Sequence, residues 1–196
     1  MHPAGRTRSA FRRVLAPVLR PSAALAAILL LDLVREARGW PLPVLGLLDE
    51  PAHLLTAWLV LAAGTARTTA LRILPWVLAG AVLLDLDHVP LFLGFDVTAT
   101  QSGRPVPHSL TTVAVLLLAA LVVRRWRAAL AGLAAGVATQ LLRDLSTGPG
   151  VPLFWPVLAA DVRLPYLAYL LVLVTLVVTA TARRISGRAD GAAAAA

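Results

Sequence analysis

Several apolar segments of this sequence begin or end with histidine or aspartate. The residues concerned are His53, Asp85, Asp87, His88, His108 and Asp144. Imidazole and carboxylate groups are the ligands left for zinc and related divalent metals in a chain without cysteine, and this chain has none. A metal site assembled between helices is therefore the first chemistry that these residue types predict.

The segment LLDLDHVP holds the densest group of such residues. Asp85 and His88 are three residues apart and share one face of a helix, whereas Asp87 points elsewhere. Pro90 disfavours helical geometry at Val89, so a helix that unwinds near His88 would let the two aspartates converge. The alternative is a helix end among lipid headgroups, but two carboxylates there oppose the helix dipole, and a divalent cation would compensate them.

Three other segments complete the candidate site. In DEPAH, Pro51 suits a first helical turn and Asp49 or Glu50 suits its cap, which explains the acids but not His53. Gln140 and Asp144 face the same way, and an ion pair between Arg143 and Asp144 is the alternative to ligation. Ser109, directly after His108, fits a helix N-terminus as well as it fits a nucleophile.

The elements that carry these residues are predicted to lie in a bilayer. The chain has 196 residues, of which 59% are hydrophobic and 14% charged, and a soluble domain would carry roughly a quarter charged residues. We therefore expect an all-α fold, a polytopic membrane bundle of about six transmembrane helices. The expected spans are residues 21–35, 51–66, 71–93, 107–123, 127–145 and 164–182.

Arginine placement predicts the orientation. All 18 basic residues are arginine, and 13 of them precede the first span, follow the sixth, or lie in loops of the same side. Basic loops stay in the cytoplasm, so we expect both termini there and the opposite loops outside. This orientation, together with anionic lipid headgroups, accounts for the net charge of +8, so we expect no nucleic-acid partner. The chain then divides into an Arg-rich cytoplasmic segment at 1–20, a single membrane domain at 21–185 and a low-complexity tail at 186–196. The alternative is that the N-terminal part is a cleaved signal segment.

Acidic residues show the reverse asymmetry. Of the ten carboxylates, Asp190 is the one on the predicted cytoplasmic side. Ionisable groups at membrane depth are costly unless they are paired or functional. The outward ends of the helices are thus the predicted location of the site.

The succession GAVLLDLDH, RPVPHS and LLRDLSTGPGVPLFWP resembles the YdjM-like family of inner-membrane proteins, which are assigned as metal-dependent hydrolases. The resemblance covers roughly residues 49–156 and implies a bacterial inner-membrane location. Carried over position by position, it implicates His53, Asp85, Asp87, His88, Arg104, His108, Ser109, Asp144 and Thr147.

The sequence departs from the family pattern at four positions. Leu84 stands where the pattern has proline, Gly103 and Pro105 where it has the first His and the Gly of HRG, and Gln140 where it has the His of H-x-x-x-D. Losing two imidazoles leaves three readings: fewer metals, recruitment of Asp49 or Asp161, or a retained scaffold without catalysis.

The leading hypothesis is a membrane-bound hydrolase with one or two divalent metals, zinc first, at the extracytoplasmic face. The expected ligands are His53, Asp85, Asp87, His108 and Asp144, with His88 or Asp49 as general base. Arg104, Arg143, Ser109 and Thr147 would contact a phosphorylated or lipid substrate. The competing hypothesis is a non-catalytic membrane protein, an assembly or stress-response factor or an ion or proton conduit, in which the same residues form structural ion pairs. The sequence predicts no oligomeric state.

Overall fold

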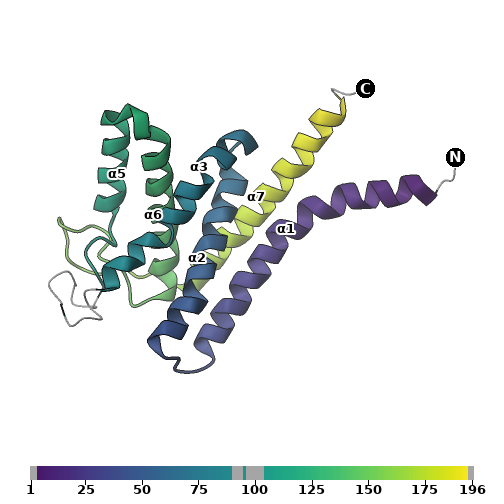
Figure 1. Cartoon of the computed structure of the whole chain (residues 1–196). Helices are drawn as coiled ribbons and strands as arrows, with labels where there is room; N and C mark the ends of the chain where they lie inside the picture. Colours follow the sequence, from purple (N-terminus) through teal and green to yellow (C-terminus); the bar gives the residue numbers. More distant parts are fainter. Residues whose placement is uncertain (1–3, 90–94, 96–103, 194–196) are drawn as a thin grey trace.

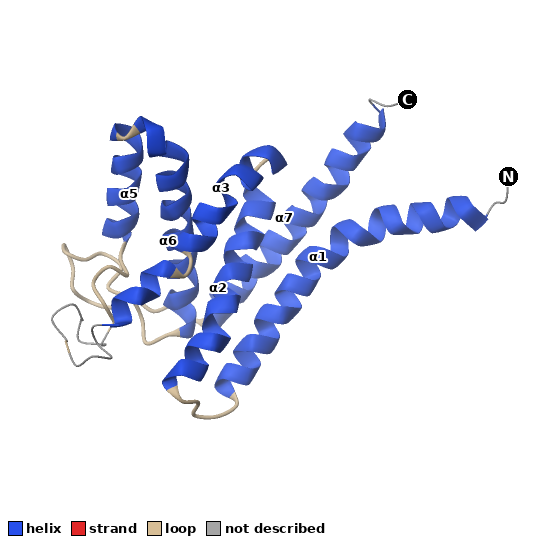
Figure 2. Ribbon diagram, viewed as in Figure 1, coloured by secondary structure: helices blue, strands red, loops and turns tan. Residues whose placement is uncertain are grey.

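The computed structural model describes residues 4–89, 95 and 104–193. Every regular element in this part of the chain is a helix, apart from one isolated β-bridge, which confirms the all-α prediction (Figure 2). The α-helices are α1 (Ala4–Glu36), α2 (Leu42–Gly64), α3 (Arg67–Gly80), α5 (Leu110–Val122), α6 (Arg127–Thr147) and α7 (Tyr166–Ala193). Two 3₁₀ helices, η1 (Leu83–His88) and η2 (Arg124–Trp126), complete the order.

Four segments are long and apolar enough to cross a membrane. They are Pro17–Glu36, Pro43–Gly64, Thr68–His88 and Tyr166–Gly187. Helix α5 is apolar but has 13 residues, and α6 holds Arg143 and Asp144 near its end. The chain is thus a polytopic membrane protein, and a total of six spans remains a prediction.

The helices run antiparallel along the chain, so their ends gather in two groups (Figure 1). Helices α1, α3 and α6 finish at the end where α2, α5 and α7 begin, and both termini lie at the other end. Ile28, Leu59 and Leu173 form the buried core between α1, α2 and α7. Packing of this kind fixes the relative height of the helix ends, which is what a site built from those ends requires.

Three glycines let α6 approach α3 closely. Cβ atoms added at Gly80 and Gly136 would overlap the backbone of the facing helix, and one at Gly132 would lie 2.7 Å from Cβ of Trp76. Small residues at such a crossing allow helix backbones to meet, which is how membrane helices without a hydrophobic driving force associate. This contact sets the position of α6, which carries Asp144 at its far end.

Two helix boundaries differ from the expectation. We expected helices to begin near Pro21 and at Pro51, but α1 begins at Ala4 and α2 at Leu42, with these prolines inside. A proline costs one backbone hydrogen bond and bends the helix, and α1 does change direction partway along its length (Figure 1). Asp49 therefore lies within α2 rather than at its cap. The tail from residue 186 is helical as far as Ala193.

The segment between α6 and α7 has no helix, as its Pro and Gly content predicts. Gly150 has φ of 112°, a conformation that glycine adopts without strain. Val151 and Val162 pair as an isolated bridge, and the backbone N–H of Leu110 donates to the carbonyl of Leu153 at 2.9 Å. The segment is thus attached to the start of α5, beside the helix ends that carry the candidate ligands.

Candidate metal centre

Among the described residues, two groups of three side chains could each hold a metal ion, and both lie toward the end of the bundle where α3 and α6 finish. One group is Asp85, His88 and His108; the other is Asp49, His53 and Asp144. Within each group the candidate ligand atoms lie within 4.8 Å of one another. These groups bring together all five predicted ligands except Asp87, which contacts the first group directly.

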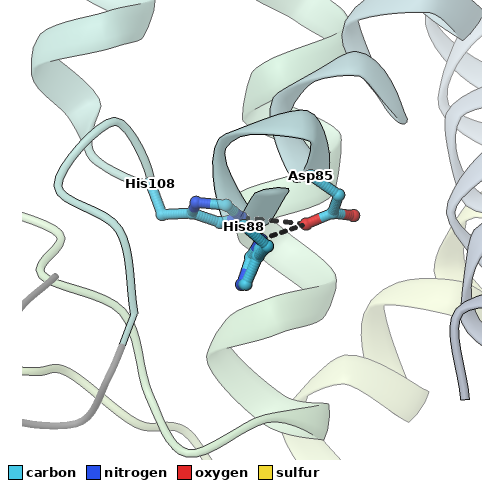
Figure 3. A group of neighbouring side chains, drawn as sticks. All are labelled: Asp85, His88 and His108. Atoms are coloured by element: carbon cyan, nitrogen blue, oxygen red, sulfur yellow. Dashed lines mark hydrogen bonds and ion pairs between the residues drawn. The ribbon is translucent and has the colours of Figure 1, made fainter. Parts of the chain in front are cut away.

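Figure 3 shows the first group, which η1 and the turn before α5 position. Nε2 of His108 lies 3.1 Å from Oδ1 of Asp85, and its Nδ1 lies 3.1 Å from Oδ2 of Asp87. Nδ1 of His88 lies 3.0 Å from Asp87 and 3.6 Å from Asp85. The 3₁₀ geometry of η1 brings both aspartates to one imidazole, so the predicted convergence of Asp85 and Asp87 is found. The predicted cause is wrong, because Val89 keeps helical backbone angles (φ −57°, ψ −44°) and the α-helix already ends at Gly80.

The second group is more deeply buried. Nε2 of His53 lies 3.8 Å from Oδ2 of Asp49, one turn earlier on α2, and 3.7 Å from Oδ1 of Asp144 on α6. His53 and Asp144 are each 1% exposed. Neither distance is a hydrogen bond, because N···O hydrogen bonds fall near 2.9 Å.

Asp144 joins the two groups. Its Oδ1 faces His53, while its Oδ2 lies 3.6 Å from Nε2 of His108 and 3.1 Å from Nη1 of Arg104. One carboxylate thus has an imidazole of each group beside a different oxygen. A carboxylate placed in this way can bridge two cations.

Arg143 occupies a different position from the one we expected. Its guanidinium is fully buried and donates to Oδ1 of Asp49 at 2.7 Å and to Oδ1 of Asp32 at 2.6 Å. The ion pair with Asp144, which was the alternative to ligation, is not found, because Arg143 pairs with Asp49 and Asp32 instead. A role of Arg143 as a substrate contact stays a prediction. The hydroxyl of Tyr169 lies 3.4 Å from Nη1, which completes the environment of the guanidinium.

Two of the smaller predicted site residues make local bonds or none. Thr147 donates its hydroxyl to the carbonyl of Arg143 at 3.1 Å, a bond within one helical turn. Ser109 is the residue that precedes α5, is 1% exposed, and its Oγ finds no hydrogen-bond partner among the described residues. Both residues lie beside the centre, and their roles as substrate contacts stay predictions.

Buried polar atoms without partners test whether the centre suits a cation. Within the described residues, both ring nitrogens of His53 and both amide atoms of Gln140 lack a hydrogen bond. A buried polar group normally finds a partner, because leaving it unsatisfied costs about 1–3 kcal/mol. The residues present therefore fit a metal at His53, and they fit it with mixed nitrogen and oxygen donors.

The spacing of the donor atoms agrees with that fit. Ligands at about 2.0–2.2 Å from a tetrahedral zinc ion lie about 3.3–3.6 Å apart. The contacts of Asp85 with His88, at 3.6 Å, and of His53 with Asp144, at 3.7 Å, lie at or just above this range. The other ligand atoms of each group lie within 4.8 Å of one another, so the three side chains would draw closer together around an ion.

A family model, described as the YdjM inner membrane protein, matches residues 48–196. The chain belongs to this family. Its location is accordingly the inner membrane, in agreement with the apolar helices. No curated protein and no solved structure matches the chain.

The departures from the YdjM pattern fall at different places in the structure. Gln140 is fully buried one turn before Asp144, and Leu84 lies in η1 beside Asp85. Gly103 lies outside the described residues. Asp161, a possible recruit, is in neither of the two groups, whereas Asp49 is in one.

Sequence reasoning missed the acidic partner of Arg143 and its surroundings. Asp32, near the end of α1, accepts from Arg143 and also from the hydroxyl of Tyr166 at 2.7 Å. A single aspartate after the apolar run AALAAILLL was the available signal. Its partner could not be read from the sequence, because pairing depends on how α1, α6 and α7 are rotated about their axes.

Proposed function

We propose that this chain is a membrane-bound metal-dependent hydrolase with its centre at the extracytoplasmic face, acting on a phosphoester such as a lipid headgroup. The observation that carries the proposal is the buried imidazole of His53. Its nitrogens lack hydrogen-bond partners among the described residues, while carboxylate oxygens of Asp144 and Asp49 lie 3.7 and 3.8 Å away. A cation shared by these three side chains would satisfy them.

The proposed ligands for one or two divalent ions, zinc first, are His53, Asp85, Asp87, His108 and Asp144. A cation held there would supply Lewis-acid chemistry, polarising a phosphoryl or acyl oxygen and activating water. The charge supports this proposal. Among the described residues, the ion-pair partners of Asp85 and Asp87 are His88 and His108, and no guanidinium pairs with either carboxylate.

His88 is the proposed proton carrier. Its side chain is 22% exposed, whereas those of His53 and His108 are buried, and Asp87 lies 3.0 Å from its Nδ1. A carboxylate that orients an accessible imidazole is the arrangement of a general base. Asp49 suits that role less well, because Arg143 holds it in an ion pair. His88 can alternatively act as a ligand beside Asp85.

Arg104 is the proposed contact for an anionic group of the substrate. Its guanidinium touches Asp144 from the side of the loop that follows α6, and about a tenth of its side chain is exposed. Guanidinium groups bind phosphate oxygens in pairs, which favours a phosphoester over a neutral substrate. Arg143 would instead hold Asp49 in position through their ion pair.

The second candidate function is a non-catalytic membrane protein, either an assembly or stress-response factor or an ion or proton conduit. The ion pairs of Arg143 with Asp32 and Asp49, and of Arg104 with Asp144, favour it. A conduit requires proton or ion flux in liposomes that disappears in Asp85→Asn. Flux of that kind would replace the hydrolase proposal.

The test is metal content followed by hydrolysis. Protein purified from zinc-supplemented cells should carry zinc by mass spectrometry, and the double variant Asp85→Ala/His108→Ala should lose it. Glu36→Ala, an exposed carboxylate at the same end, is the control and should keep it. Zinc-loaded protein should then cleave phosphodiester or phosphomonoester headgroups. Wild-type protein without metal, or a double variant with unchanged metal, would overturn the proposal.

A further inference from the structure

A hollow lies at the opposite end of the bundle from the metal centre. It has a volume of about 580 Å³ and lies between α1, α2, α3 and α7. Its walls include Leu61 on α2 and Leu71 and Leu74 on α3, with alanines between them. All four helices contribute to the candidate membrane spans, so this hollow opens where the bundle meets lipid.

Among the described residues that line this groove, three are arginines and none is acidic. Arg20 comes from α1, and Arg183 and Arg184 come from the end of α7. The guanidinium carbon of Arg184 lies 5.3 Å from the ring centre of Trp58, which is a cation–π distance. Trp58 thus holds one cation in place against the wall, while Arg20 and Arg183 are exposed at the rim.

The groove combines arginine side chains with apolar walls, and a ligand that fills it must match both. Guanidinium groups bind phosphate oxygens, and leucine and alanine walls bind hydrocarbon. A soluble anion would use the arginines but leave the apolar walls in water, whereas a neutral lipid would offer Arg20 and Arg183 no anionic group. The orientation of the chain explains why basic residues lie at the predicted cytoplasmic end. It does not explain why arginines from two helices line one hollow with apolar walls.

We infer that this groove, bounded by Arg20, Trp58, Leu71, Arg183 and Arg184, binds one anionic phospholipid of the leaflet at the end of the bundle where the termini lie. The phosphodiester lies among the arginines, and an acyl chain lies along Leu61, Leu71 and Leu74. This site is separate from the metal centre and does not depend on hydrolysis. Each arginine near a membrane surface contributes enough attraction to change affinity about fivefold.

The experiment measures lipid retention by native mass spectrometry. Full-length protein is exchanged into nanodiscs of phosphatidylcholine with a minor share of phosphatidylglycerol, then released from them. Wild-type protein should retain one phosphatidylglycerol, and Arg183→Gln should retain about fivefold less. The triple variant Arg20→Gln/Arg183→Gln/Arg184→Gln should retain none above background.

The matched control removes three positive charges from a different site at that end, the connection between α5 and α6. Arg124→Gln/Arg125→Gln/Arg127→Gln lies between α5 and α6, outside the groove, and should keep the retained lipid. Equal loss in both triple variants would mean diffuse attraction to a basic face and would overturn the inference. Retention in the groove variant would do the same.

Two further experiments distinguish a lipid headgroup from free phosphate and locate the bound lipid in variants that keep the apolar wall. Inorganic phosphate at millimolar concentration should not displace the retained lipid; displacement would show a phosphate site rather than a lipid site. Brominated phosphatidylglycerol should quench tryptophan fluorescence in wild-type protein more than in Trp58→Phe, a variant that preserves the apolar wall. Equal quenching in the two proteins would place the lipid elsewhere.

Discussion

Nε2 of His53 lies 3.7 Å from Oδ1 of Asp144, although the two residues come from the middle of α2 and the end of α6. The other oxygen of Asp144 faces His108. One carboxylate therefore connects the two groups of candidate ligands, and its position decides whether they act as one centre.

Replacing this carboxylate should weaken both groups together. In Asp144→Asn the side chain keeps its size but loses its charge, so we expect zinc affinity to fall by at least about tenfold. Calorimetric zinc titration measures it, with Asp161→Asn as the control outside both groups. Loss confined to one of two sites would argue against a shared carboxylate.

Removing metal should lower the stability of the protein. A ligand at about one hundred times its dissociation constant adds about 2.7 kcal/mol to the folded state. A chelator should therefore lower the midpoint of thermal unfolding in detergent, and zinc should restore it more effectively than magnesium, since imidazole ligands favour zinc. Midpoints unaffected by chelator and zinc would contradict a metal bound to the folded chain.

Arg143→Met should destabilise the bundle strongly. The substitution leaves the carboxylates of Asp32 and Asp49 without their buried cation, and breaking a buried ion pair costs about 3–5 kcal/mol. Reversible unfolding in mixed micelles measures the change. Arg163→Met, at an exposed position of the same end, should have little effect, and adding Asp32→Asn to Arg143→Met should recover part of the loss. Equal effects at both arginines would refute the network.

One substitution at two glycines should have opposite effects. Gly136→Ala places a methyl group against the backbone of α3 and should destabilise the protein, whereas Gly46→Ala meets open space on α2. Alanine in a helix is favoured over glycine by about 0.5–1 kcal/mol, so Gly46→Ala should be neutral or stabilising. The same unfolding measurement compares them. A tolerated Gly136→Ala would mean that α3 and α6 are less closely packed.

Gln140 offers a gain-of-function test. Its amide is buried one turn before Asp144 without a hydrogen bond among the described residues. Gln140→His should raise zinc affinity because imidazole is a better zinc ligand than an amide. Gln140→Leu keeps the volume, removes the unsatisfied polar atoms, and should stabilise metal-free protein. Unchanged affinity in Gln140→His would place this side chain outside the centre.

The sequence predicted which candidate ligands come together better than it predicted which residues form ion pairs. Antiparallel helices bring His53, Asp85 and Asp144 near one level, as predicted. The predicted unwinding at Val89 was wrong: Asp87 joins the group because α3 ends at Gly80 and the 3₁₀ helix η1 follows. The expected helix start at Pro51, with Asp49 or Glu50 as its cap, was wrong, because tertiary packing holds this proline inside α2. Residue spacing gives the height of a side chain along a helix, but the partner of Arg143 depends on helix rotation, which only packing decides.

Helix α5 has 13 residues, so it rises about 20 Å against a hydrocarbon core of about 30 Å. It can cross only where the bilayer beside it is thinned. His108 lies two residues before Leu110, where α5 begins, so this thinning would carry phospholipid headgroups toward the centre instead of requiring a substrate to leave the membrane.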